Sequence, residues 1–387
     1  MQMQVIKKMV FHYPKIIFVF FISSFFSSCI DPVAPEFEFK EGLVFVESIA
    51  STATKASFVS IKRSTIEFGV YVVKFVEGAS VNFENTATGE IVNLVETRNS
   101  YLPPEDFVVL PGEEWKLNIQ LANGKKIEST PEPVLASIPI TNIQVRYDPE
   151  LVFRDNLGGK FVPGHEVSID FVDPGGEDNY YYWSYKTYEN LDYCEKCFEA
   201  IWRNGECTPV EIARFRARYF DYACDIDCWR IRFPESVTIF DDQFSDGKSV
   251  NQFPVGDLLL YTKENMVIEV QQFTLTPAAY EYYKVLKDVV DNNSGLNAPP
   301  PAALVGNLSN PNDAEDFVFG RFTAAATSTA SLFIDRNLIE ETAIESREPI
   351  NLEPQIASPY PPPATVQAPC SENRTRTAVQ PEKWESQ

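Results

Sequence analysis

Cys29 has the sequence context of a cysteine that becomes lipid-modified. Three lysines precede a largely apolar run, Ile16 to Phe26, and the small pair Ser27-Ser28 separates that run from Cys29. This is the order of a secretory signal, which has a basic start, an apolar middle and a small-residue cleavage site. The run is shorter than the roughly 20 residues that span a bilayer. We therefore expect residues 1–28 to be a signal peptide and Cys29 to be acylated, with a plain cleaved signal as the alternative.

The remaining cysteines have the even count of a disulfide framework. They are Cys194, Cys197, Cys207, Cys224, Cys228 and Cys370. Clustered cysteines also suit zinc, but an exported protein meets an oxidising compartment in which thiols pair. Six cysteines allow fifteen pairings, and the sequence does not choose among them. Five of them lie within residues 190–232, so one must pair outside this insertion or stay unpaired, and Cys370 is the candidate partner.

Arginines and aromatic residues lie between these cysteines, in a chain whose formal net charge is −22. Both residue types are enriched at protein interfaces. The candidates for partner contact are Arg214, Arg216, Arg218, Trp202 and Trp229. The alternative is a solvated helix face whose arginines pair with neighbouring glutamates.

No motif for catalysis emerges from the sequence. His165 lies in a turn-like Pro-Gly-His-Glu context without a nucleophile elbow, so we expect a surface or strand-edge residue. The acidic loop Asp241–Gly247 has Phe244 where a calcium loop needs an oxygen ligand, so we expect a loop with adventitious acids. A pair of catalytic carboxylates as in glycosidases is defined by the distance between them in space, and the sequence does not indicate such a pair. We expect a protein that is not an enzyme and has no metal or cofactor.

The elements that would position these residues are mainly strands. Residues 41–135 alternate in short runs, and Trp115–Leu121 and Lys125–Thr130 flank Asn123-Gly124 as a hairpin. This predicts an immunoglobulin-like β-sandwich that ends near Pro131-Glu-Pro133.

Residues 136–340 read as a second β-rich domain that contains the cysteine-rich insertion, residues 190–232. Tyr180–Tyr188 could stack on sugars, but alternation places half of its rings in a core. Phe317–Thr323 and Ser331–Ile334 are expected as separate strands.

Two helices are expected within this second domain. Thr276-Pro277 begins a helix over residues 277–293, because a capping residue precedes proline at the first helical position. A capping box at Thr208–Glu211 begins another, which runs to about Tyr222. Residues 29–40 read as a tether, and residues 341–387 as an extended proline-rich tail.

The charge excludes one class of partner. Removal of residues 1–28 makes the net charge more negative still, because that segment holds lysines and no acid. Phosphate binding needs clustered basic residues, so nucleic acid is excluded as a partner.

Eight short motifs, taken in order, resemble one family of Bacteroidota lipoproteins, known as domain of unknown function 4249. They are Val76–Ala79, Asn123–Lys125, Asp173–Tyr181, Phe240–Gly247, Tyr280–Tyr283, Val305–Leu308, Phe319–Phe322 and Pro381–Trp384. The resemblance covers nearly the whole chain, although the family would have more than one cysteine near Cys370. It implies an outer-membrane lipoprotein encoded beside a TonB-dependent receptor.

These observations lead to one expectation of function and one alternative. We expect a non-enzymatic lipoprotein, held in the outer membrane by acyl chains, that is an accessory or substrate-capture partner of a TonB-dependent transporter barrel. Asp31 and Glu36 near Cys29 weakly indicate the cell surface. The alternative is a free-standing surface binder of glycans or peptides.

Overall fold

The computed structural model describes residues 41–155, 158–191, 195–198, 200–203, 206–209, 220–223, 228–291, 304–344 and 374–384. These residues are mainly β-strand, as predicted, and contain one described helix, α3 (Pro277–Asp291). Residues 41–387 belong to one compact unit.

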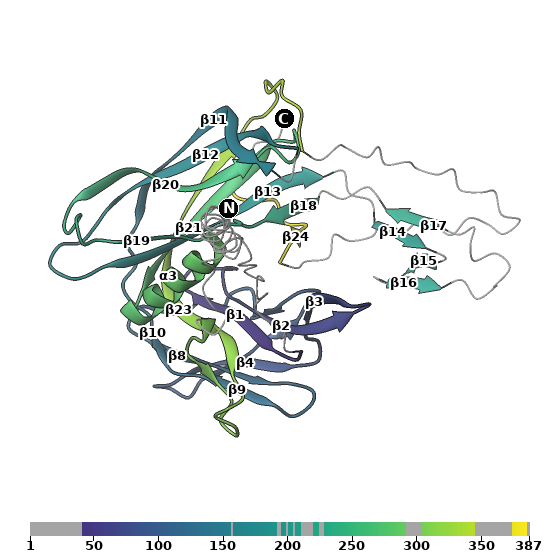
Figure 1. Cartoon of the computed structure of the whole chain (residues 1–387), viewed down its shortest axis with the longest axis vertical. Helices are drawn as coiled ribbons and strands as arrows, with labels where there is room; N and C mark the ends of the chain where they lie inside the picture. Colours follow the sequence, from purple (N-terminus) through teal and green to yellow (C-terminus); the bar gives the residue numbers. More distant parts are fainter. Residues whose placement is uncertain are drawn as a thin grey trace, which may run out of the picture. The chain divides into compact units, whose positions relative to one another are not determined.

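The largest sheet has eleven strands and contains residues from both sides of the predicted domain boundary (Figure 1). Its main path is β24 (Arg376–Thr377), β18 (Cys228–Arg232), β13 (Tyr180–Leu191), β21 (Met266–Leu275), β23 (Val318–Ile334), β1 (Val44–Ser51), β2 (Phe58–Glu67), β7 (Tyr101–Leu102) and β6 (Val95–Glu96). Two more strands join from the side, β19 (Thr238–Asp241) on β13 and β3 (Val70–Phe75) on β2.

A second sheet has six strands and packs against the β1–β2 end of the first. Its strands are β22 (Leu308–Ser309), β9 (Lys126–Ser129), β8 (Glu114–Gln120), β4 (Ser80–Asn85), β5 (Ile91–Asn93) and β10 (Glu132–Pro133). The hairpin predicted around Gly124 is present, and Gly124 has the positive φ of 86° that the turn requires. Trp115, Leu117 and Ile119 alternate into a core with Val46 and Ile61 of the larger sheet.

A third sheet covers one face of the other end of the long sheet. It consists of β11 (Ile140–Arg154), β12 (Lys160–Val172) and β20 (Ser249–Leu259). Phe171 of β12 packs against Tyr181 and Trp183 of β13 in this second core. The ring alternation expected for Tyr180–Tyr188 is therefore confirmed.

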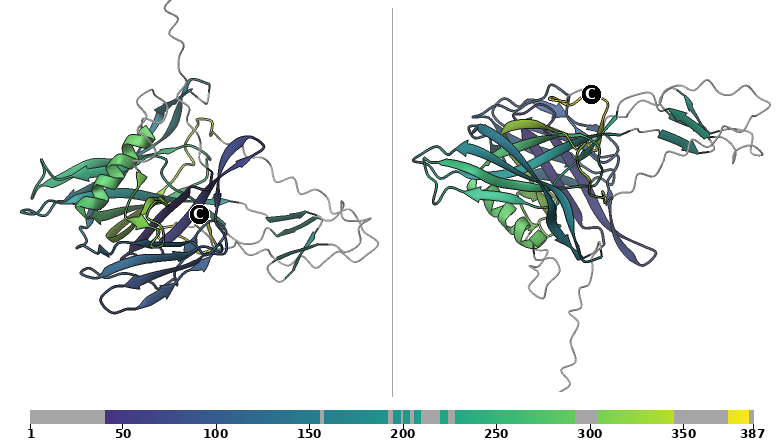
Figure 2. Two further views of the ribbon diagram at one scale, coloured as in Figure 1. Left: turned by 60° about the horizontal axis from the view of Figure 1, so that its bottom comes forward. Right: turned by 90° about the horizontal axis from the view of Figure 1, so that it is seen from above.

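Helix α3 packs on the opposite face of β13 and β21 (Figure 2). It begins at the predicted residue, where the Thr276 hydroxyl accepts a hydrogen bond from the Ala279 main chain at 3.2 Å. Tyr283 of the helix stacks on Tyr182 of β13, with ring centroids 4.4 Å apart. The two faces of β13 thus belong to two different cores.

The capping box predicted at Thr208 is not a helix start. Thr208 and Pro209 belong to β16 (Glu206–Pro209), which pairs with β15 (Ala200–Arg203), and Tyr222 belongs to β17 (Phe220–Ala223), which pairs with β14 (Glu195–Phe198). Residues 210–219 lie outside the described part of the chain. Strand pairing at Thr208 overrides the local capping preference, which is a weak one.

The two strands expected at residues 317–323 and 331–334 are one strand, β23. Small residues such as Ala324 and Ala326 connect them, and these are buried although their hydrophobicity is low. β23 pairs parallel with β1 and antiparallel with β21. One strand from late in the chain therefore lies between the first strand and the central ones, so hydrogen bonds cross the boundary expected near residue 135.

Candidate functional site

A cavity of about 310 Å³ lies on the face of the long sheet that continues from helix α3. Residues of β1, β13 and β21 line it, together with the loops around Lys55 and Glu105 and the C-terminal residues 374–382. Ligand pockets typically have volumes of about 300–1,000 Å³ and combine apolar walls with a few polar groups. The cavity has the size and composition for a small molecule.

Strand alternation determines which side chains point into this cavity. Tyr182, Ser184, Lys186 and Tyr188 share one face of β13, because side chains of a strand alternate between its two faces. Across the ladder, Phe273 of β21 is opposite Tyr182, Gln271 opposite Ser184 and Glu269 opposite Lys186. The floor therefore changes from aromatic beside the helix to charged at its far end.

Lys186 is the least exposed of the three cations that line this cavity, with a side chain that is 12% exposed. Its ammonium donates to the Lys55 carbonyl at 3.0 Å and lies 3.8 Å from the Glu269 carboxylate. Burial lowers the pKa of Lys186, and the Glu269 carboxylate offsets this only in part. Glu269 also accepts from Gln271 at 2.8 Å. Lys186 is thus a largely desolvated charge in a long ion pair with Glu269.

Arg374 closes the same cavity from the C-terminal segment. Its guanidinium donates to both carboxylate oxygens of Glu47, at 2.9 and 3.2 Å. The guanidinium carbon also lies 3.8 Å from the ring centroid of Phe58 and 4.6 Å from that of Phe233. A bidentate ion pair combined with cation–π contacts binds an arginine side chain strongly. Arg374 therefore holds residues 374–382 over the cavity.

A second cavity, of about 360 Å³, lies on the other face of β13 around Thr187 and Glu189. Four of its five charged side chains form two ion pairs, and the fifth is Asp257. Arg232 donates to Glu189 at 3.1 Å, and Glu235 accepts from Arg154 at 3.0 Å. We regard the first cavity as the better candidate, because it contains the buried cation with the weaker pairing.

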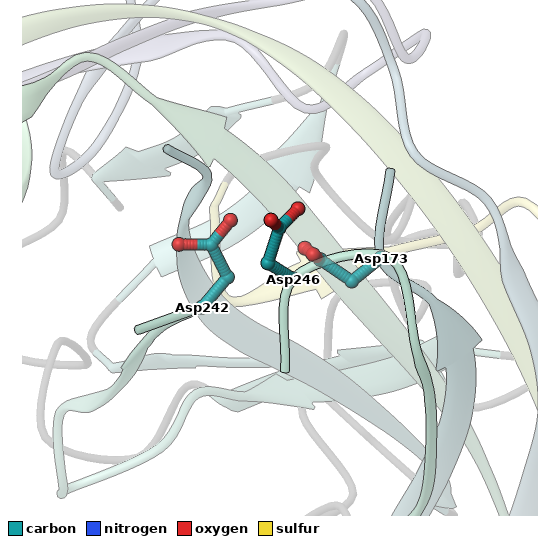
Figure 3. Close-up of side chains that lie close together, drawn as sticks. All are labelled: Asp173, Asp242 and Asp246. Atoms are coloured by element: carbon teal, nitrogen blue, oxygen red, sulfur yellow. The ribbon is translucent and has the colours of Figure 1, made fainter. Parts of the chain in front are cut away.

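Three aspartates from two turns meet near the end of the third sheet (Figure 3). Carboxylate oxygens of Asp173, Asp242 and Asp246 lie within 4.8 Å of one another, and Asp173 and Asp242 are buried. Carboxylates are suitable ligands for Ca²⁺. Sequence spacing does not reveal this group, since Asp173 lies far from the others in the chain.

Each of these carboxylates already accepts hydrogen bonds that close the turns. Asp173 accepts from the Tyr181 hydroxyl, Asp246 from the Gly176 main chain at 2.7 Å, and Asp242 from the Asn179 main chain at 2.9 Å. Burial raises the pKa of Asp173, and the charges of the two other aspartates add to this. The cluster therefore has a structural explanation as the junction between the two turns.

Most of the residues predicted as sites fall outside the described side chains. Cys29, Cys194, Cys224, Cys370, Arg214, Arg216 and Arg218 lie outside the described residues, and Cys197, Cys207 and Trp202 are described only as backbone. Cys228 is buried in β18. The disulfide framework and the arginine contacts stay predictions.

Trp229 and His165 differ from the sequence expectation. Trp229 is 3% exposed and packs edge-on against Trp384, so its ring lies inside rather than on a contact surface. His165 is 4% exposed and lies in β12, the middle strand of the third sheet, whereas we expected a surface or strand-edge residue. It faces inward because the third sheet packs on the long one. A local sequence motif does not reveal this packing of two sheets.

Lys186 and Arg374 were not predicted as site residues from the sequence. The signal for Lys186 was available, since the alternation of Tyr180–Tyr188 places a lysine on one face with Tyr182. Arg374 had no such signal, because its partners Glu47 and Phe58 are more than 300 residues away in the sequence.

The fold and the cavity define a mainly β protein with a candidate binding pocket on its central sheet. The chain belongs to the family described as "Domain of unknown function (DUF4249)", whose match extends over residues 30–331. No curated protein and no solved structure matches the chain. Within the described residues, no helix has the length and apolar character to span a membrane.

Proposed function

We propose that this protein is a non-enzymatic lipoprotein of the outer membrane that captures a small ligand for a TonB-dependent transporter. Acyl chains on Cys29 hold it to the membrane, on the side that faces the cell surface. The observation that supports capture is the cavity above Lys186, which has the volume of a ligand site. The family membership and the signal-like residues 1–28 agree with such a role.

The surroundings of Lys186 favour a ligand that has one acidic group and an apolar body, which must bind clear of the four glutamates that also line the cavity. Arg374 makes a bidentate ion pair with Glu47, whereas the Lys186 ammonium lies 3.8 Å from the carboxylate of its partner, Glu269. A ligand carboxylate, sulfonate or phosphate near Lys186 would stabilise a charge that burial now disfavours. Phe58 and Tyr182 provide apolar surface for the rest of the molecule.

The dye 8-anilinonaphthalene-1-sulfonate has this chemistry and tests the cavity directly. We expect saturable binding by the full chain, with affinity reduced by about tenfold or more in Lys186→Met, because a hydrogen bond to a charged group contributes about 1.5–3 kcal/mol. Lys126→Met, at an exposed position of β9, is the matched control. Equal affinity in the wild type and Lys186→Met would remove Lys186 from the site.

The affinity should also depend on pH. Because burial lowers the pKa of Lys186, its ammonium loses the proton at a lower pH than an ordinary lysine. Binding of the sulfonate is therefore expected to weaken as the pH rises through that lowered pKa, and Lys186→Met should lose this dependence. A fluorescence titration at a series of pH values measures it.

The insertion at residues 190–232 is the proposed contact with the transporter, braced by disulfides among its cysteines. Reversal of charge at Arg214, Arg216 and Arg218 should reduce copurification with a barrel from mild-detergent extracts of the membrane. Reversal at the exposed residues Arg98, Lys126 and Lys248 is the control. Unchanged copurification would exclude the insertion from this role.

The alternative function is a free-standing surface binder of glycans or peptides. The aromatic side chains of the cavity, among them Tyr182, Tyr188 and Phe233, favour it. A protein that extracts alone but binds glycans or peptides, and loses this with Tyr188→Ala, would support the alternative.

A further inference from the structure

The hairpin of β2 and β3 has an apolar tip that no other part of the described chain covers. Ile66 is 40% exposed, Val73 52% and Val70 61%, and Phe68 at the turn is fully exposed. Among the described strands β3 pairs only with β2, which leaves its outer edge open to them, and the hairpin extends beyond the neighbouring strands (Figure 1). Contiguous exposed apolar residues of this kind mark interaction sites.

The turn itself is unusual for the residue it contains. Glu67 and Val70 are paired, so Phe68 and Gly69 form a two-residue loop, with φ of 51° and 78°. Asparagine or aspartate usually precedes glycine in such a turn, since bulky residues are strained at positive φ. Phe68 gains no packing against the described residues in return. A strained and fully exposed aromatic residue indicates a binding role.

The chain leads into the compact unit beside this hairpin. The Glu41 carboxylate accepts a hydrogen bond from the Ile66 main chain at 2.7 Å, and the Gly42 main chain donates to the Ser64 carbonyl at 2.9 Å. Fully extended, the chain from Cys29 to Glu41 spans at most about 40 Å. An acylated Cys29 thus keeps the hairpin within that distance of the bilayer.

The charge of the hairpin is suited to a lipid surface. Lys62, Arg63 and Lys74 are its basic residues, in a chain whose net charge is −22. They outnumber the acids beside them, which are Glu67, paired with Lys74, and Glu41. These basic residues lie toward the base of the hairpin, behind the apolar tip. Apolar side chains that enter the boundary of the acyl chains, with basic residues at the headgroups, are the pattern of interfacial membrane binding.

We infer that the β2–β3 hairpin inserts Phe68 and its apolar neighbours into the outer leaflet of the membrane that holds the acyl chains of Cys29. The inference rests on the proposed lipid anchor and adds a second, protein-made contact. This contact fixes the orientation of the compact unit on the bilayer, which acyl chains on a tether do not.

Tryptophan at the turn provides the test. The acylated full chain with Phe68→Trp is placed in vesicles of phosphatidylethanolamine and phosphatidylglycerol whose acyl chains are brominated, and emission is compared with that in unbrominated vesicles. The wild type gives the background emission of the native tryptophans in both kinds of vesicle. Phe244→Trp, at a residue 84% exposed in a different loop, is the matched control. We expect bromine to remove most of the emission that Phe68→Trp adds and to leave that of Phe244→Trp unchanged.

Phe68→Asn separates stability from binding. Asparagine tolerates positive φ, so this variant should fold at least as well, but its residues 66–70 should lose the amide protection that vesicles give the wild type in hydrogen exchange. Protection that persists in Phe68→Asn would contradict insertion through Phe68.

Three results would overturn the inference. Equal quenching at both positions, or no quenching at Phe68→Trp, excludes insertion of the hairpin. If the protein still floats with the vesicles in that case, the acyl anchor holds it without the hairpin. Concentration-dependent dimers with an unquenched Phe68→Trp assign the hairpin to a second copy of the chain. A mass of the Cys29 peptide without acyl chains refutes the anchor, and the insertion falls with it.

Discussion

The titratable side chains Lys186 and His165 differ in whether a ligand can reach them. Lys186 faces a cavity that a ligand can enter, whereas His165 lies between two sheets. Burial lowers the pKa of His165 to about 4, and the positive charge of Arg336 adds to the shift. Lys186 can bind a ligand, since an acidic group that enters the cavity would stabilise its charge. His165 makes stability depend on pH.

The folded protein should lose stability between pH 6.5 and pH 4. The unfolded chain takes up a proton on His165 near pH 6.5, whereas the folded chain does so only near pH 4, so the stabilising contribution is complete above pH 6.5 and disappears below 4. We expect about 2 kcal/mol, after allowance for solvent screening.

His165→Gln supplies the comparison for this prediction, because glutamine does not titrate. Urea denaturation should show that the free energy of unfolding falls less between pH 7 and pH 4.5 in the variant than in the wild type. The carboxyl groups of the protein titrate alike in both, so the difference reports on His165. An identical loss in the two proteins would show that His165 is accessible to protons in the folded state.

At the scale of elements, Glu132 connects three parts of the fold. It accepts from Arg321 of β23 at 2.6 Å on both carboxylate oxygens, and from the hydroxyl of Thr276, which caps α3, at 2.8 Å. Both charged side chains are 5% exposed. Glu132 lies within Pro131-Glu-Pro133, near which we expected the first domain to end. It is instead a buried junction between β10, β23 and α3.

Removal of Glu132 should therefore be costly. Glu132→Ala leaves Arg321 as a buried charge without its partner, for which we expect a loss of about 3–5 kcal/mol in the free energy of unfolding. Glu90→Ala, at an exposed position before β5, should change it by less than about 0.5 kcal/mol. Thermal and urea denaturation of the two variants measures both. A small effect of Glu132→Ala would mean that water reaches Arg321.

Sequence patterns predicted the local elements well and the long-range ones poorly. The hairpin at Gly124 and the start of α3 depend on turn and capping residues next to each other in the chain, so both were found. The parallel pairing of β1 with β23 joins residues about 270 positions apart, and no local pattern specifies it. Thr208 shows the converse, since a local capping signal lost to strand pairing.

The same limit applies to the candidate site. Lys186 could have been noticed from the alternation along β13, but its burial depends on loops and on residues 374–382. The aspartates of the acidic cluster come from two turns, and only the pairing of β12 with β20 and β13 with β19 brings these together.

At the scale of the whole molecule, the shared sheet predicts cooperative unfolding of residues 41–344. β8 and β21 lie on different sides of the expected domain boundary but are connected through β1 and β23. The amides of Leu117 in β8 and Ile268 in β21 should therefore exchange with the same free energy and denaturant dependence in native-state hydrogen exchange. Exchange of one of them at a clearly lower free energy would show two independent domains.

The proposed function places the cavity, the lipid anchor and the transporter contact in one chain. Residues 374–382 lie over the cavity and are held by Arg374, so a ligand site is formed by segments from both ends of the compact unit. Capture of a ligand is the central claim, because anchoring and partner binding would also suit a purely structural accessory.

Native mass spectrometry of the protein extracted from its own outer membrane in mild detergent tests this claim most directly. We predict that the wild type and the control Lys126→Met both carry a non-covalent acidic small molecule beyond the acyl chains, and that Lys186→Met does not.

The comparison therefore has three samples: the wild type, the control Lys126→Met and the variant Lys186→Met. The account predicts the bound molecule in the first two and its loss from Lys186→Met. A wild type whose mass is that of the acylated polypeptide alone, or a molecule retained equally by Lys186→Met, would contradict capture in this cavity.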